Sequence, residues 1–395
     1  MQPLVARMWP YQASVFSEMS TLAAALGAVN LGQGFPDSDG PEQLKRIAMR
    51  AIEDGSGNQY PPRHGLPELL DAVCAHQRDW YGLDYEPSTE AVIGTGASEL
   101  LAAAVLALVE PGDEVIVLEP WFDIYPAAVA LAGARAVPVP LTRSGDRFGL
   151  DVPAIRSAIT PRTRALLLNT PHNPTATVFT EAELTELATE VIDQDILVIS
   201  DEVYEHLVYP PAVHLPIARL PGMRERTVTI GSGGKSFSFT GWKVGWAAGP
   251  ADLIAAVRVV RQHLSYVSSG PFQPAIAAGL RFPRSYFTEF ATDLHRRREL
   301  LAGGLRDLGM HVYDTEGTYF VLTDSQALGW DSGAEFVNHL AHEAGVVAIP
   351  VAPFSTGRFD SLVRWTFCKR DHVLATALDQ LRRADLANHG VNRRQ

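Results

Sequence analysis

The sequence predicts an α/β fold in which a large α/β sandwich domain, with a mainly parallel sheet, is joined to a smaller α+β domain. Short β-branched runs alternate with longer helical patterns through the middle of the chain, which is typical of βαβ units. The chain has 395 residues, whereas single hydrophobic cores stop growing at roughly 250–300 residues. Beyond residue 280 the pattern changes, so we expect two domains.

Five short segments in the middle of the chain are almost continuously hydrophobic, as expected for parallel strands that are covered on both faces. These segments are Val115–Leu118, Ala136–Pro140, Ala165–Asn169, Ile196–Asp201 and Val228–Ile230. Between the third and the fourth, Glu181–Asp193 carries apolar residues at a spacing that makes one helix face. We also interpret the apolar run Leu100–Val109 as a helix.

The last part of the chain predicts a different arrangement. A charged helix at Glu289–Leu308 precedes short strands at Tyr319–Leu322, Val346–Ile349 and Leu362–Phe367. We therefore expect residues 46–280 to form the large domain. Residues 1–45 and 281–395 are expected to form the small one.

Charge and composition exclude several classes of protein. Lys and Arg number 33 and Asp and Glu 45, so the net charge is −12. Such a chain is a poor partner for nucleic acid or for an anionic membrane. The longest apolar run, Leu100–Val109, has about half of the ~20 residues that a membrane helix needs. The N-terminus shows no signal-peptide pattern, and two cysteines make no disulfide framework, so we expect a cytoplasmic protein.

The segment Gly231–Trp246 carries the strongest chemical signal. Gly234-Lys235-Ser236 ends like a phosphate-binding P-loop, but that motif needs a glycine where this chain has Thr229. What remains is a lysine with Ser232 before it and Lys243 after it. This combination suits pyridoxal 5'-phosphate (PLP), since one lysine must form a Schiff base and the phosphate needs a cation and hydrogen-bond donors.

Two further segments fit the same cofactor. Asp201 ends a predicted strand, where a carboxylate can pair with the protonated pyridine nitrogen. Tyr204, three residues later, and Asn173, in a proline-flanked loop, can bond the phenolate oxygen of the ring. The twelve histidines show no clustered metal-ligand spacing, so we expect no metal site.

The chain resembles the fold-type I, class I/II PLP-dependent aminotransferases. The resemblance runs almost end to end. Within this family the chain is most similar to two groups: the kynurenine aminotransferases with glutamine transaminase K, and the N-succinyldiaminopimelate aminotransferases. The segments that carry it are Val29–Asp37, Asn58–Tyr60, Asn169–Thr175, Ile199–Tyr204, Gly231–Lys243 and Val363–Lys369.

The resemblance implies a role for each site residue. Lys235 would hold PLP covalently and move the substrate proton. The other residues expected to bind the cofactor are Ala97, Ser98, Phe122, Asn173, Asp201, Tyr204, Ser232 and Lys243, with Tyr60 contributed by the neighbouring subunit of a homodimer. Arg364 would bind the substrate carboxylate, and Asn173 and Gly34 would lie against the same substrate. Trp121 competes with Phe122 for the stacking role.

Some positions depart from the family pattern. Ala176 stands where the motif usually has glycine, and Ser98 where many kynurenine-type enzymes have an aromatic residue. Ser268 and Ser269 replace an aromatic residue and a histidine of the animal members. Arg63 has two readings, a ligand for a distal substrate acid and a structural residue.

The resulting hypothesis is an aminotransferase that moves an amino group from an amino acid to a 2-oxo acid by a ping-pong mechanism. Its donor is of the N-succinyldiaminopimelate or the glutamine, methionine or kynurenine type. The alternative is a PLP-dependent C–S β-lyase acting on cysteine conjugates. A PLP-sensing transcription regulator is disfavoured, because the motif that begins by residue 30 leaves no room for a DNA-binding module before it.

Overall fold

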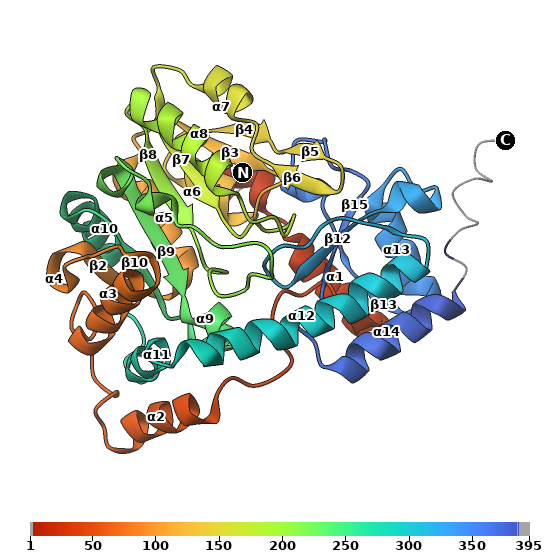
Figure 1. Ribbon diagram of the computed structural model, residues 1–395, viewed down its shortest axis with the longest axis horizontal. Helices are drawn as coiled ribbons and strands as arrows, with labels where there is room; N and C mark the ends of the chain where they lie inside the picture. The colour runs from red at the N-terminus through yellow and green to blue at the C-terminus, as the bar shows by residue number, and fades with distance from the viewer. Residues whose placement is uncertain (1–2, 385, 387–395) are drawn as a thin grey trace.

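The computed structural model describes residues 3–384 and 386, and its centre is a seven-stranded sheet (Figure 1). In spatial order the strands are β2 (Ala91–Gly94), β10 (Gly245–Ala248), β9 (Thr227–Ser232), β8 (Leu197–Asp201), β7 (Thr163–Asn169), β3 (Glu114–Glu119) and β4 (Arg135–Pro140). The strands from β9 to β4 are all parallel. This confirms the mainly parallel sheet.

The edge of the sheet next to β9 was not predicted. Strand β10 runs antiparallel to both β9 and β2. Its sequence, Gly245-Trp-Ala-Ala248, has no β-branched residue, so it carries no strand signal by itself. Its pairing with β9 comes from the chain reversal after Lys235.

Helices cover both faces of this sheet. Strand β2 shows the division, since Val92 packs into one apolar cluster while Ala91 and Ile93 pack into another on the opposite face. The helices of this part are α2 (Glu42–Glu53), α3 (Pro67–Tyr81), α4 (Pro87–Glu90), α5 (Gly96–Leu108), α6 (Ile124–Leu131), α7 (Val152–Ala158), α8 (Glu181–Asp193), α9 (Gly233–Ser236), α10 (Ala251–Leu264) and α11 (Gln273–Leu280). The predicted helices at Glu181–Asp193 and Leu100–Val109 correspond to α8 and α5.

A second, antiparallel sheet has the order β11-β12-β15-β14. Its strands are β11 (His311–Val312), β12 (Phe320–Asp324), β15 (Leu362–Thr366) and β14 (Ile349–Pro350). Around it lie α1 (Val15–Leu26), α12 (Arg284–Asp307), α13 (Gly333–Glu343), α14 (Asp371–Arg383) and the parallel pair β1 (Val29–Asn30) and β13 (Val346–Val347). The remaining pair is a hairpin of β5 (Thr142–Ser144) and β6 (Arg147–Gly149).

The long helix α12 connects the two parts (Figure 1). Phe287 near its start packs with α3 and α11, whereas Leu294, Leu301 and Leu305 pack with the second sheet. The division of the chain at residues 45/46 and 280/281 stays a prediction. One detail of the predicted strands was wrong: Val346–Ile349 is not one strand, because the chain pairs first with β1 and then, after Ala348, with β15.

In the described part of the chain, no helix is both long and apolar enough to span a bilayer.

Candidate active site

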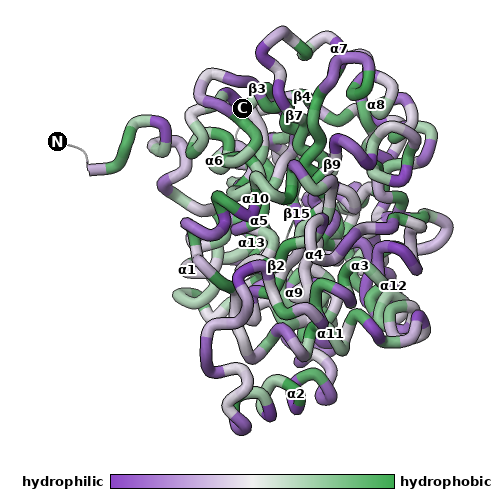
Figure 2. Tube along the Cα trace, turned by 90° about the vertical axis from the view of Figure 1, so that its left-hand side faces the viewer, coloured by the Kyte–Doolittle hydropathy of each residue, from purple (hydrophilic) through white to green (hydrophobic). Residues whose placement is uncertain are grey.

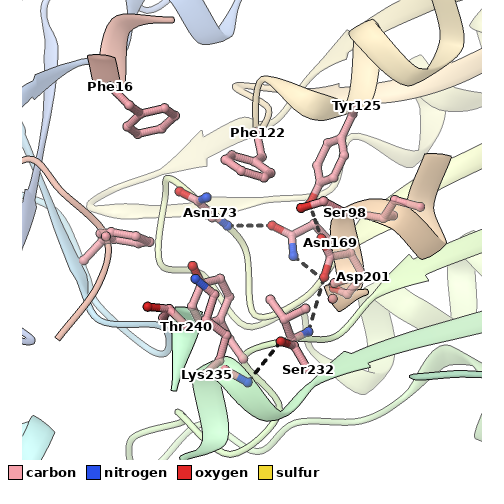
Figure 3. A pocket seen from close by; sticks show the side chains of 18 of the residues that line it. Phe16, Ser98, Phe122, Tyr125, Asn169, Asn173, Asp201, Ser232, Lys235 and Thr240 are labelled. Atoms are coloured by element: carbon pink, nitrogen blue, oxygen red, sulfur yellow. Dashed lines mark hydrogen bonds between the residues drawn. The ribbon is translucent and has the colours of Figure 1, made fainter. Parts of the chain in front are cut away.

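A cavity of about 340 Å³ lies beyond the carboxyl ends of the parallel strands (Figure 3). Ligands in open α/β sheets bind at this edge, because the loops that follow the strands converge there. The predicted site residues that line it are Gly34, Ala97, Ser98, Phe122, Asn173, Asp201, Tyr204, Ser232, Lys235, Lys243 and Arg364. The structure thus brings together residues that are scattered over most of the chain.

Asp201 is the last residue of β8 and lies opposite Asn169 at the end of β7. Its Oδ2 accepts a hydrogen bond of 2.8 Å from the Tyr125 hydroxyl, and its Oδ1 accepts one of 3.3 Å from the Val203 amide (Figure 3). Burial raises the pKa of Asp201 to about 6, although these bonds act in the opposite direction. A cationic ring nitrogen placed beside this carboxylate would favour its charged form.

Lys235 lies in α9, the single turn that follows β9. Its Nζ donates a hydrogen bond of 2.9 Å to Tyr319 Oη and lies 5.6 Å from the centre of the Tyr204 ring. Lys235 is partly exposed to the cavity, but desolvation of its amine lowers the pKa of Lys235 to about 8. An amine with this pKa is neutral often enough near neutral pH to act as a nucleophile or a base.

The start of α5 forms the opposite wall. Gly96 has a φ of +76°, and a Cβ built on it would lie 3.1 Å from Lys243 Nζ. A Cβ on Gly245 would lie 2.7 Å from the backbone nitrogen of Ala97. The two glycines therefore let the lysine segment approach the first turn of α5, where amides and dipole favour an anion. Together with Ser232, these groups match the needs of a phosphate.

Arg364 is buried in β15 with only 1% of its surface exposed. Its Nη1 donates to Asn173 Oδ1 at 2.9 Å and its Nη2 to the Gly32 carbonyl at 3.0 Å, while Nε has no hydrogen-bond partner among the described residues. The Phe320 ring lies 4.0 Å from the guanidinium carbon. Burial lowers the pKa of Arg364 to about 10, and a carboxylate would compensate this buried cation.

Several residues of the cavity were not predicted: Phe16, Gln33, Gly96, Leu101, Tyr125, Asn169, Val203, Gly234, Thr240 and Phe320. Tyr125 could have been found only by knowing that the start of α6 faces the end of β8. Phe320 reaches Arg364 through the pairing of β12 with β15. Asn169 ends a predicted strand and was the one residue with a readable signal, since polar residues at strand ends face the ligand edge.

Tyr60 does not line the cavity. Its side chain is 79% exposed and packs edge-to-face on Tyr266 at 5.4 Å. Arg63 is also exposed, and its Nη1 donates to Gln262 Oε1 at 3.0 Å. The roles expected for both residues stay predictions.

Ala176 has a φ of +62° and is fully buried. A left-handed conformation costs an L-residue other than glycine roughly 1–2 kcal/mol. Hydrogen bonds hold the residue there, because its carbonyl accepts from the amides of Glu316 and Gly317 at 2.9 and 2.8 Å. Glycine, which the family motif usually has at this position, would adopt the same conformation without strain, whereas Ala176 does not.

A buried polar group lies behind the lysine segment. Among the described residues, His76, Glu205 and His206 place ligand atoms within 4.8 Å of one another. Glu205 accepts from Tyr81 Oη at 2.7 Å and lies 3.1 Å from His76 Nε2. Burial opposes the charge on Glu205, but the two histidines outweigh it and lower its pKa to about 2. These contacts make a buried, hydrogen-bonded polar cluster, and the expectation of no metal site stays a prediction.

The parallel sheet, the lysine after β9 and the buried carboxylate after β8 define the class of fold-type I PLP enzymes. A family model for aminotransferase class I and II matches residues 27–381, and the chain belongs to that family. It is accordingly a PLP-dependent aminotransferase, and the lyase alternative is not favoured.

Relatives of known name support the same assignment. A probable N-succinyldiaminopimelate aminotransferase of Mycobacterium tuberculosis is 49% identical over 95% of this chain and 97% of the relative. The solved structure of that Mycobacterium tuberculosis aminotransferase covers 96% of this chain and 99% of its own, with a TM-score of 0.94. The methionine aminotransferase of Escherichia coli is 36% identical over 93% and 95%. Mouse kynurenine–oxoglutarate transaminase 3 is 37% identical over 92% and 86%.

Proposed function

We propose that this aminotransferase takes an amino acid with a long, polar side chain, of the N-succinyldiaminopimelate type, as its donor. The observation that carries the proposal is a buried arginine and a lysine in one cavity whose α5 wall presents Ser98 rather than an aromatic ring. A small residue there leaves space for a long side chain. The 49% identity with the mycobacterial relative supports the same class of donor.

The cavity residues would share the work as follows. PLP, when bound, withdraws electrons from the substrate Cα and so makes its proton acidic. Lys235 Nζ would carry the cofactor and, once free, would move that proton from the substrate Cα to C4′ of the cofactor. Asp201 would keep the ring nitrogen protonated, with Asn173 and Tyr204 on the ring oxygen and Phe122 against the ring face. Lys243, Ser232 and the amides of Ala97 and Ser98 would hold the phosphate.

The substrate would be oriented from the other side. Arg364 would take the α-carboxylate in two hydrogen bonds, which places Cα near Lys235. Gly34 would form the backbone wall against that substrate: a Cβ at this position would lie 2.9 Å from the Phe320 ring. Such positioning supplies much of the rate enhancement in reactions of this kind.

We further propose a cytoplasmic homodimer with Tyr60 reaching the phosphate of the partner subunit. Support comes from large apolar side chains that stay exposed on the N-terminal segment, on α2 and α10 and on the loops that follow these helices: Leu4, Val5, Trp9, Met49, Ile52, Tyr60, Val259, Leu264 and Tyr266. The N-terminal segment, which carries three of them, extends away from the body (Figure 2). Cys74 and Cys368 are buried and free, as suits a reducing compartment.

The test is a donor panel with the purified enzyme and 2-oxoglutarate as acceptor. N-succinyldiaminopimelate should give a kcat/KM at least tenfold above glutamine, methionine and kynurenine. With donor alone, about one equivalent of 2-oxo acid should form per subunit, since the ping-pong cycle stops without acceptor. A higher kcat/KM for methionine or kynurenine would contradict the proposed donor.

Borohydride reduction of the PLP-loaded enzyme, followed by peptide mapping, tests the lysine. The label should appear on Lys235. A label on another lysine would contradict the site assignment, whatever the donor panel shows.

A further inference from the structure

The hydroxyl of Tyr319 bridges Lys235 and the N-terminal segment of the cavity wall. It accepts a hydrogen bond of 2.9 Å from Lys235 Nζ and donates one of 2.6 Å to the Gly34 carbonyl. A carbonyl oxygen can only accept, so the single phenol proton is directed to Gly34. Lys235 Nζ therefore faces the lone pairs of the Tyr319 hydroxyl oxygen, and Lys235 is the donor in the hydrogen bond between them.

Tyr319 is fixed in this position. It is 1% exposed, it lies directly before β12, and its ring packs edge-to-face on Tyr204 at 5.3 Å. Burial, with the neighbouring Tyr204, raises the pKa of Tyr319 well above its usual value, so it keeps its proton. A buried phenol that keeps its proton and is hydrogen-bonded on both sides is suited to holding another group in place.

Three side chains from the second sheet and its flanks donate to backbone carbonyls of the segment that contains Gly34. Arg364 donates to the Gly32 carbonyl at 3.0 Å, and Lys369 donates to the Phe35 carbonyl at 2.8 Å. Tyr319 holds the carbonyl between them. Of these three contacts, the one from Tyr319 is also a contact to Lys235.

We propose that Tyr319 is a positioning residue that holds the Lys235 amine whenever this amine is not bonded to the cofactor. Through its second hydrogen bond, to Gly34, Tyr319 thereby couples the release of the lysine to the ordering of residues 32–37 over the substrate. The proposal rests on the proposed function, since it takes Lys235 as the cofactor lysine. Bonded to PLP, the Lys235 nitrogen would carry at most one proton and would be a poorer donor to Tyr319 than the free amine. After release, the amine is a full donor, and the bridge to Gly34 is complete.

The bridge also acts on the charge of the lysine. A lone pair that accepts from the ammonium stabilises the charged form. Loss of this acceptor lowers the pKa of Lys235 below its already reduced value. It also removes one of the three side-chain hydrogen bonds to the carbonyls of residues 32, 34 and 35.

The test compares two forms of the full-length enzyme. Reconstitution with PLP leaves Lys235 bonded, whereas pyridoxamine 5′-phosphate has no aldehyde and leaves the lysine free. Hydrogen–deuterium exchange, read by mass spectrometry on a peptide containing residues 32–37, should be at least threefold slower in the pyridoxamine 5′-phosphate form of the wild-type enzyme. Equal exchange in the two forms would overturn the coupling without any variant.

Tyr319→Phe keeps the ring and removes the bridge. In this variant the difference between the two forms should disappear. The Lys235 pKa, measured from the pH dependence of competitive acetylation in the pyridoxamine 5′-phosphate form, should fall by at least half a unit. Tyr313→Phe is the matched control, because Tyr313 is equally buried but bonds Asp324 and Arg143. An unchanged Lys235 pKa in Tyr319→Phe, or an equal change in Tyr313→Phe, would overturn the proposal.

These results are separable from the proposed function. If borohydride labels another lysine, the assignment of Lys235 as the cofactor lysine fails, yet the bridge would still show itself in the Lys235 pKa. If Lys235 is labelled and neither readout responds to Tyr319→Phe, the bridge fails alone.

Discussion

Arg364 and Asn173 lie 191 residues apart in the chain and are joined by a hydrogen bond of 2.9 Å from Nη1 to Oδ1. Because the amide oxygen of Asn173 is occupied by the guanidinium, its NH₂ group is left as the donor available to a ligand. The Asn173 backbone amide in turn donates to Asn169 Oδ1 at 2.7 Å. One asparagine thus connects the proposed carboxylate position with the proposed ring-oxygen position.

Arg364→Lys should impair substrate use far more than cofactor binding. Lysine offers one point charge with three donors where arginine offers a planar fork with five, so it cannot give a carboxylate two parallel hydrogen bonds while it also bonds Asn173 and Gly32. We expect kcat/KM to fall by on the order of 100-fold, which corresponds to about 2.7 kcal/mol, while PLP stays bound. Arg382→Lys, on the exposed side of α14, is the control. Unchanged kinetics in Arg364→Lys would remove this residue from the site.

Tyr125→Phe should make cofactor binding more sensitive to acid. The Tyr125 hydrogen bond lowers the pKa of Asp201, which burial has raised to about 6. Without that bond the pKa rises further, so the carboxylate is protonated at a higher pH and pairs less well with a cationic ring nitrogen. The PLP dissociation constant, followed by fluorescence from pH 8 to pH 6, should therefore increase more steeply than in the wild type.

The comparison for Tyr125→Phe is Asp201→Asn, which has no titrating group at this position. Its PLP affinity should be weak at every pH, by on the order of 100-fold, with a flat profile between pH 6 and 8. Parallel profiles for Tyr125→Phe and the wild type would show that Asp201 does not pair with the ring nitrogen.

The sequence revealed the parallel strands because each is a separate buried run, and it revealed the groups that follow them, such as Lys235 and Asp201, because strand ends converge. It could not reveal Tyr319 or Phe320. Phe320 lines the cavity because β12 pairs with β15, where it lies opposite Thr366, a residue far along the chain. Tyr319, directly before β12, contacts Lys235 for the same reason. Strand β10 was missed for a similar reason, since Gly245-Trp-Ala-Ala248 becomes a strand only when β2 and β9 supply its partners.

Tyr60 should act on the partner's site. A Tyr60→Ala chain mixed with a Lys235→Ala chain gives hybrid dimers in which one site carries both defects and the other carries none, if Tyr60 serves the neighbour. Activity should then recover to about half of wild type per hybrid dimer, well above either parent. The exposure of Tyr60 and its absence from the lining of its own cavity motivate the experiment.

The control for the hybrid experiment is Arg364→Ala mixed with Lys235→Ala. Both of these residues line the cavity of one subunit, so every hybrid site carries one defect and no recovery is expected. Recovery in this control would show that recovery does not report a residue shared between subunits. No recovery with Tyr60→Ala in verified hybrids would place Tyr60 in its own subunit's site or outside the chemistry.

His172→Asn should flatten the loss of stability in acid. His172 is 1% exposed, and burial lowers its pKa to about 3, so the folded protein holds it neutral. The unfolded chain takes up a proton near pH 6.5, and the native state does not, so stability is lost as the pH falls from about 6.5 toward 3. Between pH 7 and pH 5 this site alone lowers the free energy of unfolding by about 2 kcal/mol.

In His172→Asn, the asparagine retains a polar group near Thr175 Oγ1, which lies 2.8 Å from His172 Nδ1 in the wild type, but this group does not titrate. Urea unfolding at pH 7 and pH 5 should therefore show a difference smaller by about that amount in His172→Asn, with His342→Asn on the exposed face of α13 as the control. An undiminished difference would mean that His172 is already protonated in the folded protein.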